Sequence, residues 1–506
     1  MSKEIELKLT LPPEAAERFC EHSFLAALTS KHRHLYNTYY DTPEFDLRRR
    51  GIALRLRRIG ESEWVMTVKG GDSGAGGLAA RSEWEAPTQP GVFDFGIVGD
   101  VALRAFLLGY TPRLQAVFTT DFTRRLWVLE RPGARIELVL DRGSVVAGAG
   151  RREEAICEVE LELLAGDSTD ALFDLAIELS ADFHLHPEVR SKAERGYALC
   201  DAVQRLVPFK AQASMLAAEM TPVEAFRAIA LACVLHLQRN EVGVQQDGEA
   251  EFIHQARVAI RRLRSAFKLF APVLAPAFVA VYAPRWKALA IRLGAARDWD
   301  VFVGETLPAF AAVSENGTAV QALHQAADVA RRSAQKAATA AFFDHEYSRL
   351  VLAFSAALLR EDVLAIAKVP SLRYRGLGLK AFAERRLRRL EKAVEKRSRR
   401  AEASEKRRHK LRIDFKRLRY AFDFFAPLFG RKRTPAYQDM LARLQDVLGQ
   451  LNDLATAEEL CAQLPMEPAF SQQLEGWLDG ARKRQQAELV QVLLRFARCR
   501  PPWRNA

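Results

Sequence analysis

The sequence has few cysteines and no long apolar segment. Its six cysteines are widely scattered along 506 residues and form no C-x-x-C pair, so we expect reduced thiols and neither a disulfide framework nor a zinc site. No apolar run reaches the roughly 18 uncharged residues that a membrane-spanning helix needs. The first residues, MSKEIELKL, also lack the apolar stretch of a signal peptide. Together these absences predict a cytoplasmic protein without a membrane anchor.

Charge is abundant and is unevenly distributed. The formal net charge is +12. Residues 1–200 contain 25 Lys and Arg against 31 Asp and Glu, which gives −6, whereas residues 201–506 contain the other 50 against 32, which gives +18. This asymmetry predicts two modules, the second of which is attracted to a polyanion. Nucleic acid, an anionic membrane surface and inorganic polyphosphate all have the required charge.

The length predicts two or three domains, and the secondary-structure pattern changes once along the chain. Up to about residue 200, short alternating runs separated by Gly, Pro and Asp predict strands, interrupted by helical patterns near Pro13–Leu28 and Thr169–Ser180. From about Pro222 onward, long Ala-, Leu-, Arg- and Glu-rich segments predict helices. We therefore predict a first domain over residues 1–205, a linker over 206–221 and a helical domain over 222–505, duplicated near 222–370 and 371–505.

A glycine-rich segment, GGDSGAGG at residues 70–77, does not indicate a nucleotide site. It lacks the G-x-x-x-x-G-K-[ST] pattern and lies between two predicted strands, not before a helix. We interpret it as the connection of a hairpin.

Charged residues alternate with apolar residues in the predicted strands. In EIELKL, Glu4, Glu6 and Lys8 share one face and aliphatic side chains share the other. The pattern recurs in strands that contain Arg55 and Arg57, Lys69, Arg81, Glu83 and Glu85, Arg124, Glu137 and Asp141, and Glu158, Glu160 and Glu162. A sandwich with one solvated face explains any single strand of this kind. A closed antiparallel barrel with a charged lumen better explains why carboxylates gather on some strands and basic groups on others.

A charged lumen requires charged contents. Two carboxylates ~4 Å apart repel by about 4 kcal/mol at an effective dielectric near 20. Divalent cations such as Mg²⁺ bind carboxylate oxygens and bridge to phosphates, and Arg and Lys bind multiply phosphorylated anions. The strands therefore predict a site for a metal ion and a short phosphate chain.

Residues 4–8, EIELK, resemble the ExExK motif of the CYTH superfamily, whose members are also called triphosphate tunnel metalloenzymes. The resemblance continues in family order through YYDTPEFDLRRRGIALRLRR, TVKG, RSEWE, TTDFTRR, IELVLDRG, CEVELELL and SKAERGY, and covers about residues 1–205. It implies an eight-stranded tunnel that binds a linear triphosphate and hydrolyses it, or cyclises it in some members, with Mg²⁺ or Mn²⁺.

The same resemblance implies roles for individual residues. Phosphate oxygens would be bound by Lys8, Arg55, Arg57, Lys69, Arg124 and Lys192. A metal ion would be held, directly or through water, by Glu4, Glu6, Glu83, Asp141, Glu158 and Glu160. Arg81 would orient neighbouring carboxylates, and Glu85 and Glu162 would line the tunnel or support it. The choice between Arg124 and Arg125 stays open, because neighbouring residues of a strand point to opposite faces.

The implied chemistry is metal-assisted phosphoryl transfer to water. Its catalytic residues would be Lys8, Glu4 and Glu6. Lys8 could act as the base only if nearby positive charge or desolvation lowers its pKa.

The second half contains an internal duplication. HQARVAIRRLRSAFKLFAP from His254 and HKLRIDFKRLRYAFDFFAP from His409 lie 155 residues apart without a gap. At the same offset LGAARDWD matches LGQLNDLA, which aligns Asp298 with Asp453. On a helix the His and Arg residues of the motif fall on one face. A solvated basic face beside a bundle core is the simplest interpretation, but its duplication is hard to attribute to solubility alone.

These motifs resemble the CHAD domain over about residues 210–505. The resemblance implies two pseudo-symmetric helical bundles with a basic groove that binds inorganic polyphosphate. The groove would be lined by His254, Arg257, Arg261, Arg262 and Arg264, with His409, Arg412, Lys416, Arg417 and Arg419 opposite. The halves need not bind equally, because Lys416 replaces Arg261 and Asn452 replaces Arg297 in the second copy. The basic segment 385–400 either extends the groove or is solvated.

The expected fold is therefore α+β with several domains: an N-terminal eight-stranded antiparallel β-barrel followed by an all-α domain of two pseudo-symmetric helical bundles. The expected function is Mg²⁺-dependent hydrolysis of inorganic triphosphate to diphosphate and phosphate by the barrel, with polyphosphate binding by the helical domain. Association of the protein with polyphosphate granules is a further expectation. Thiamine triphosphate hydrolysis, ATP cyclisation of the class IV adenylate cyclase type and a non-catalytic polyphosphate scaffold are the alternatives. Nucleic acid is disfavoured, because the motifs interleave few aromatics apart from Tyr420 and carry no zinc finger or RNA-binding motif.

Overall fold

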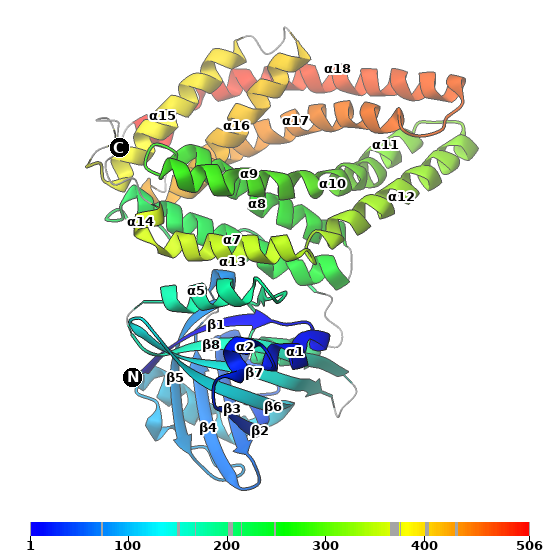
Figure 1. Ribbon diagram of the computed structural model, residues 1–506. Helices are drawn as coiled ribbons and strands as arrows, with labels where there is room; N and C mark the ends of the chain where they lie inside the picture. Colours follow the sequence, from blue (N-terminus) through cyan, green and yellow to red (C-terminus); the bar gives the residue numbers. More distant parts are fainter. Residues whose placement is uncertain are drawn as a thin grey trace. The chain divides into compact units, whose positions relative to one another are not determined.

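The computed structural model describes residues 2–71, 74–148, 152–166, 168–200, 206–213, 215–246, 249–364, 374, 376–399, 404–430 and 434–504. Contacts divide the chain into two compact units: Met1–Val207 with Asp344–Leu359, and Pro208–Phe343 with Arg360–Ala506. The expected fold class is confirmed, since a closed antiparallel barrel precedes an all-helical part in the chain (Figure 1).

Parts of several predicted features lie outside the described residues. They are residues 72 and 73 of the glycine-rich segment, the end of the first predicted domain at 201–205, position 214 of the linker, the predicted repeat boundary at 370 and 371, and Arg400 of the basic segment.

Eight strands close the barrel. They are β1 (Ser2–Thr10), β2 (Ser30–Asp41), β3 (Ile52–Ile59), β4 (Glu63–Gly70), β5 (Leu78–Pro87), β6 (Gln115–Arg131), β7 (Ala134–Ala147) and β8 (Arg152–Ala165). Their order is β5-β4-β3-β2-β6-β7-β8-β1, and β1 also pairs with β5, which closes the ring. Every neighbouring pair is antiparallel. A two-residue strand, β9 (His186–Pro187), pairs with β1 outside this ring.

The hydrophobic core of this unit lies outside the barrel wall. Leu7, Leu138 and Leu161 alternate with the charged residues of their strands and are fully buried against helices. The helices of this unit are α1 (Ala16–Cys20), α2 (Ser23–Ala26), α3 (Asp46–Arg49), α4 (Val101–Tyr110), α5 (Asp170–Leu179), α6 (Lys192–Cys200) and α13 (His345–Leu359). Because these leucines face out, the charged residues that alternate with them face in, where Leu35, Tyr39 and Phe122 also lie.

Helix α13 lies within the helical half of the sequence but packs on the barrel unit. Leu352 and Ala356 belong to the core beside β1. The Ser348 hydroxyl lies 3.0 Å from His184 Nε2 and 2.9 Å from His186 Nδ1. The first compact unit is therefore discontinuous in sequence.

The local predictions have mixed outcomes. Helices occur near both predicted segments, as short α1 and α2 and as α5, whereas α3, α4 and α6 were not predicted. The glycine-rich segment connects β4 to β5 in an antiparallel hairpin, as expected. Gly77 in this connection has a φ of 81°, and a Cβ there would collide with the carbonyl oxygen of Lys8, so only glycine fits beside β1.

The second unit is helical throughout its described regular elements. They are α7 (Pro222–Gln246), α8 (Ala250–Phe270), α9 (Pro276–Arg292), α10 (Gly294–Val301), η5 (Phe302–Thr306), α11 (Leu307–Ala311), α12 (Gly317–Ala340), α14 (Glu361–Leu364), α15 (Leu379–Ser398), η7 (Ala426–Leu428), α16 (Glu405–Phe425), α17 (Thr434–Cys461), α18 (Pro468–Arg498) and η8 (Pro502–Arg504). The duplicated motifs form α8 and α16, which pack together. Phe270 and Phe425 occupy equivalent positions in the two motifs, and their ring centroids lie 5.7 Å apart. Contact between equivalent residues is what a twofold relation of the repeats requires.

Among the described helices, none combines the length and the apolar character that would let it cross a membrane.

Candidate functional site

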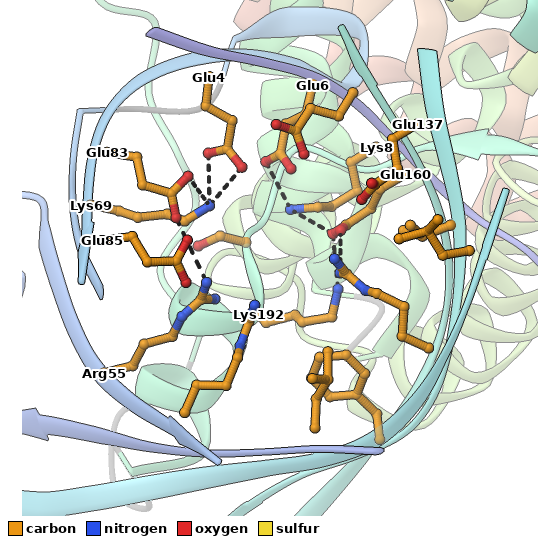
Figure 2. Close-up of a pocket in the computed structure, with 18 of the residues that line it drawn as sticks. Glu4, Glu6, Lys8, Arg55, Lys69, Glu83, Glu85, Glu137, Glu160 and Lys192 are labelled. Atoms are coloured by element: carbon orange, nitrogen blue, oxygen red, sulfur yellow. Dashed lines mark hydrogen bonds and ion pairs between the residues drawn. The ribbon is translucent and has the colours of Figure 1, made fainter. Parts of the chain in front are cut away.

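A cavity of about 360 Å³ lies inside the barrel and is lined mainly by charged side chains. Ten residues named from the sequence line it: Glu4, Glu6, Lys8, Arg55, Arg57, Lys69, Glu83, Arg124, Glu160 and Lys192. Arg81, Glu85, Glu137 and Glu162 line it as well. Figure 2 shows how carboxylates and basic groups from different strands converge on this space.

On one side of the cavity, Lys69 joins two acidic strands. Its Nζ donates to both oxygens of Glu4, at 2.8 and 2.7 Å, and lies 3.2 Å from Glu83 (Figure 2). Arg55 Nη2 lies 3.8 Å from Glu83. The carboxylates of β1 and β5 are thus held by cations of β3 and β4.

Lys192, at the start of α6, contacts three carboxylates at once. Its Nζ lies 2.8 Å from Asp141, 2.7 Å from Glu158 and 2.8 Å from Glu160. Arg124 donates to both oxygens of Asp141 at 2.7 Å and to Glu160 at 2.9 Å. Asp141 and Glu158 are 0% exposed and lie behind the cavity lining. Their position suits holding Lys192 in place, whereas Glu160 reaches the cavity.

The network fixes the charge states of its members. Burial alone would raise the pKa of Asp141, but Arg124 and Lys192 hold this pKa below its usual range. Burial would likewise raise the pKa of Glu160, but Lys192, Lys8 and Arg124 hold it well below its ordinary value. Both carboxyls are therefore ionised at neutral pH and balance the cations around them.

Lys8 is held as a cation. Its Nζ lies 3.4 Å from Glu6 and 3.5 Å from Glu160. Burial by itself lowers the pKa of Lys8, but the nearby carboxylates outweigh burial and keep this pKa above its ordinary value. The condition under which Lys8 could serve as a base, a lowered pKa, is not met in this arrangement.

Arg57 differs from the other cations of the wall. Its Nε donates to Asn37 Oδ1 at 2.7 Å, and within the described part of the chain no carboxylate lies within 4.0 Å of its nitrogens. Burial, together with the charges of Arg55 and Arg124, lowers the pKa of Arg57 to about 9. An anion bound beside Arg57 would relieve this repulsion.

Three carboxylates face one another across β1, β8 and β7. In the strand register Glu6 pairs with Glu162, and Glu162 pairs with Glu137. Burial and the charges of Glu4 and Glu137 raise the pKa of Glu162 to about 7. Carboxylate oxygens are the ligands of hard divalent cations, and such a cation would remove this repulsion, so the chemistry of these side chains, though not their present spacing, suits Mg²⁺ or Mn²⁺.

Within the residues that the structure describes, no group of three or more His, Cys, Asp or Glu side chains is close enough to hold a metal ion. Lys8 and Lys69 neutralise Glu6 and Glu4 in this arrangement. A metal ion would therefore compete with these lysines for the same carboxylates.

The structure decides which of Arg124 and Arg125 faces the cavity. Arg124 lines the cavity, whereas Arg125 donates to Ser30 Oγ at 3.2 Å and stacks 5.0 Å from the ring of Trp127, on the opposite face of β6.

Sequence reasoning missed three cations around the cavity. Lys31 and Arg33 on β2 line it, and Arg195 on α6 pairs with the buried Glu158. The alternation in SKHRHLYNTYYD was a signal for the first two residues. Arg195 lies three residues after Lys192, which places both on one face of α6.

In the helical unit, four basic residues from the two repeats come together. Burial lowers the pKa values of Arg412 and Lys416 of α16, and Arg261 of α8 adds to both shifts. Arg257 of α8 also adds to the shift of Lys416. Burial and the charges of Arg412 and Arg261 lower the pKa of Lys416 to about 7. Burial lowers the pKa of Arg257 to about 10, with Asp298 opposing and Arg261 adding to the shift. We call these four residues the basic cluster.

The basic cluster has unused hydrogen-bond donors. Buried guanidinium nitrogens of Arg257, Arg261 and Arg412 have no hydrogen-bond partner among the described residues. Arg257 also lies 3.8 Å from Asp298. Buried cationic donors without acceptors are costly unless a ligand supplies the acceptors.

The other residues named for the groove have different surroundings. Burial and Arg297 lower the pKa of His254 to about 4, so this imidazole is neutral at pH 7. His409 lines a separate cavity of about 280 Å³ with Arg412 and Asn452. The guanidinium of Arg262 lies 4.9 Å from the ring of Phe424. Burial lowers the pKa of Arg264. Arg417 lies 3.2 Å from Asp414, and Arg419 lies 3.7 Å from Asp423.

Two family models match separate parts of the chain. Residues 2–197 match the family model described as the CYTH domain, and residues 228–462 match that of the CHAD domain. An inorganic triphosphatase from Haemophilus influenzae is 34% identical over 209 residues, which is 39% of this chain and 55% of that protein. The match thus spans about half the length of this relative.

Two solved structures are also similar. The CHAD domain from the plant Ricinus communis is 33% identical, with a TM-score of 0.46 over 59% of this chain and 97% of that one. A proposed adenylyl cyclase from Hippeastrum with a dominant triphosphatase activity is 17% identical, with a TM-score of 0.31 over 38% of this chain and 95% of that one. By its two family matches, the chain contains a CYTH domain followed by a CHAD domain.

Proposed function

We propose that the barrel hydrolyses inorganic triphosphate to diphosphate and phosphate with the help of a divalent cation, and that the helical unit binds inorganic polyphosphate. The observation that carries the first part is the composition of the barrel cavity, in which carboxylates and basic groups of separate strands surround one space. The name of the Haemophilus influenzae relative, an inorganic triphosphatase, supports the same substrate.

The carboxylates would hold the metal ion. Glu4, Glu6, Glu83 and Glu160 line the cavity, and Glu137 and Glu162 add oxygen donors beside Glu6. A bound Mg²⁺ or Mn²⁺ would withdraw charge from the phosphate oxygens and activate water at neutral pH. In this proposal Asp141 and Glu158, which the resemblance implied as metal ligands, instead hold Lys192 and Arg124 in position.

The basic residues would bind and orient the triphosphate. Lys8, Arg55, Lys69, Arg124 and Lys192 surround the space at fixed positions because each is tied to a carboxylate. Arg57 donates to an amide oxygen and has no carboxylate within 4.0 Å among the described residues, so its charge is available for a phosphate. Positioning and charge neutralisation supply most of the catalysis in phosphoryl transfer. Lys8 serves as a cation that neutralises charge on the leaving diphosphate.

The first prediction concerns substrate choice. Purified protein given triphosphate, thiamine triphosphate or ATP, with Mg²⁺ or with chelator, should release phosphate fastest from inorganic triphosphate, and chelator should abolish that release. Phosphate and cyclic AMP are measured in parallel. Appreciable cyclic AMP from ATP would contradict the proposal, as would faster release from thiamine triphosphate. A protein that binds triphosphate without turnover would instead be a scaffold.

The basic cluster supports polyphosphate binding by the helical unit. Its cations are drawn from both repeats, and its buried donors have no acceptor among the described residues. A chain of phosphates supplies negative oxygens at a regular spacing and requires no base stacking. Proteins that bind single-stranded nucleic acid commonly stack bases on aromatic side chains, and the two motifs offer few suitable ones apart from Tyr420.

A second prediction follows from the pKa of Lys416, which burial and neighbouring arginines lower to about 7. A bound polyanion favours the charged amine and raises this pKa, so binding takes up a proton. Affinity for polyphosphate should therefore be highest below pH 7 and should fall above it, by at most about tenfold per pH unit for one proton. Calorimetry in buffers of different ionisation enthalpy measures the uptake.

Lys416→Arg is the matched variant, because the first repeat has Arg261 at this position. Lys416→Arg should bind polyphosphate with unchanged affinity but without proton uptake above pH 7, because arginine stays protonated. Any proton taken up by the phosphate chain itself is the same for wild type and Lys416→Arg, so it does not affect the difference between them. Equal uptake by wild type and Lys416→Arg would show that Lys416 is not the linked group.

A further inference from the structure

Two basic residues line the barrel cavity without belonging to the residues that bind phosphate in the proposed function. Lys31 and Arg33 lie on the inner face of β2, which they share with Asn37 because residues two apart on a strand point the same way. Both side chains are exposed, unlike the interior lysines. The exposed end of this strand therefore presents two basic side chains to the cavity, separated from the buried Asn37 by Leu35.

The ion pairs of the cavity leave these two charges uncompensated. Lys8, Lys69, Arg124 and Lys192 each lie within 4.0 Å of at least one carboxylate. Among the described residues, neither Lys31 nor Arg33 has a carboxylate within that distance. Since the other wall lysines are all paired, a ligand could bind here without breaking an ion pair.

The strand register increases the local positive charge. Arg33 lies directly opposite Arg124 in the pairing of β2 with β6, and like charges in that position destabilise a sheet. Arg124 already donates to Asp141 and Glu160. Burial raises the pKa of Glu137, and the opposing charges of Arg124 and Arg33 do not cancel this effect. The repulsion is thus left for an anion to relieve.

The cations also form a line. Arg57 donates to Asn37, which fixes one end at the centre of the cavity. Arg124, another of the cations proposed to hold the triphosphate, marks the other end: Arg33 lies directly opposite it on β2, and Lys31 is two residues, or about 7 Å, farther along the strand. A triphosphate held by the interior cations would leave the far end of this line free, whereas a longer linear chain could continue along it.

We propose that Lys31 and Arg33 form a distal subsite that binds the phosphates of a linear inorganic polyphosphate beyond the three held in the centre of the tunnel. This subsite rests on the proposed function, because it extends the same phosphate-binding cavity. It makes chain length, and not only triphosphate chemistry, a determinant of what the barrel binds.

The test compares inorganic tetraphosphate with inorganic triphosphate. Lys31→Ser/Arg33→Ser is measured against Arg49→Ser/Arg142→Ser, which removes two exposed charges outside the cavity. KM and kcat are determined for both phosphates with Mg²⁺. Binding is also measured by calorimetry in the full chain carrying Arg257→Glu/Arg412→Glu, so that the basic cluster of the helical unit does not contribute.

The expected result is a selective loss. Affinity for tetraphosphate should fall about tenfold in Lys31→Ser/Arg33→Ser relative to its control, equivalent to about 1.4 kcal/mol, while affinity for triphosphate changes less than about threefold. No change for tetraphosphate would overturn the subsite. An equal loss of affinity for triphosphate and tetraphosphate, or a matching loss for ATP, would mean that the two residues only attract anions in general. Either result would also overturn the subsite.

Failure of the subsite and failure of the proposed function are distinguishable. Absence of triphosphate turnover in the wild type would contradict the proposed function alone, because the calorimetric difference between the two chain lengths does not require turnover. Normal turnover with no difference between the chain lengths would contradict the subsite alone.

Discussion

Lys192→Met should abolish triphosphate hydrolysis and destabilise the barrel unit. The Lys192 ammonium lies within 2.8 Å of Asp141, Glu158 and Glu160, and two of these carboxylates are 0% exposed. Removing one partner of a buried ion pair leaves uncompensated charge and costs about 3–5 kcal/mol. We expect the free energy of unfolding at pH 7 to fall by about this amount, measured by denaturant titration.

The loss should depend on pH in a defined direction. Arg124 and Lys192 hold the pKa of Asp141 below its usual range against the effect of burial, and the pKa of Glu160 is held well below its own. Carboxyls with depressed pKa values stabilise the fold above their unfolded pKa, and this contribution is lost as the pH falls through the folded pKa. The difference between wild type and Lys192→Met should therefore be largest above about pH 5 and shrink below about pH 4.

Two further variants make this prediction decisive. Arg142→Met removes an exposed arginine on the outer face that pairs with Glu17, and should change stability by less than about 1 kcal/mol. Glu158→Gln added to Lys192→Met removes one of the buried carboxylates that lose Lys192, while Arg195 keeps its pairing with Glu154, and should recover part of the stability. If Lys192→Met were as stable as Arg142→Met at pH 7, the buried network would not have the energetic role assigned to it.

Arg257→Glu/Arg412→Glu should weaken polyphosphate binding at least about 100-fold, equivalent to about 2.8 kcal/mol. The two arginines belong to different repeats, and besides burial the charge of Arg412 helps to lower the pKa of Arg257. Reversing both replaces attraction by repulsion at the centre of the basic cluster, beside Arg261 and Lys416. Retention on a polyphosphate matrix and calorimetry at two salt concentrations measure the effect, which salt should screen.

The control is Arg332→Glu/Lys483→Glu, which makes the same change in net charge on α12 and α18, outside the basic cluster. It should alter polyphosphate affinity only slightly and similarly at all chain lengths. Far-UV circular dichroism and thermal unfolding report whether the helical unit of both variants is folded, and phosphate release from triphosphate reports whether the barrel is intact. Unchanged binding by the Arg257→Glu/Arg412→Glu variant would refute the assignment of the basic cluster.

Much of the barrel could be predicted from local pattern. The alternation in EIELKL and CEVELELL places carboxylates on one face and leucines on the other, and the structure has Leu7 and Leu161 in the outer core while Glu6 and Glu160 line the cavity. The same signal was present for Lys31 and Arg33 but was not used, because no family motif drew attention to SKHRHLYNTYYD.

Other features could not be predicted, because they depend on contacts between distant segments. Alternation gives Asp141, Glu158 and Glu160 the same inward direction, yet only Glu160 lines the cavity, because α6 places Lys192 over the other two. The charge state of Lys8 likewise depends on Glu160 of β8, which lies opposite Lys8 only because β1 and β8 pair. No periodicity within one segment contains this information.

By itself, the sequence determined which faces of the strands and helices are charged, and that the helical half is duplicated, because side-chain direction follows from the period of a single element. The tertiary structure alone decided which charges meet. It closed the ring by pairing β1 with β5, packed α13 on the barrel unit and brought α8 against α16. Those choices set the pKa values and the ion pairs, because electrostatic energy depends on distance and burial, which arise only when separate segments pack together.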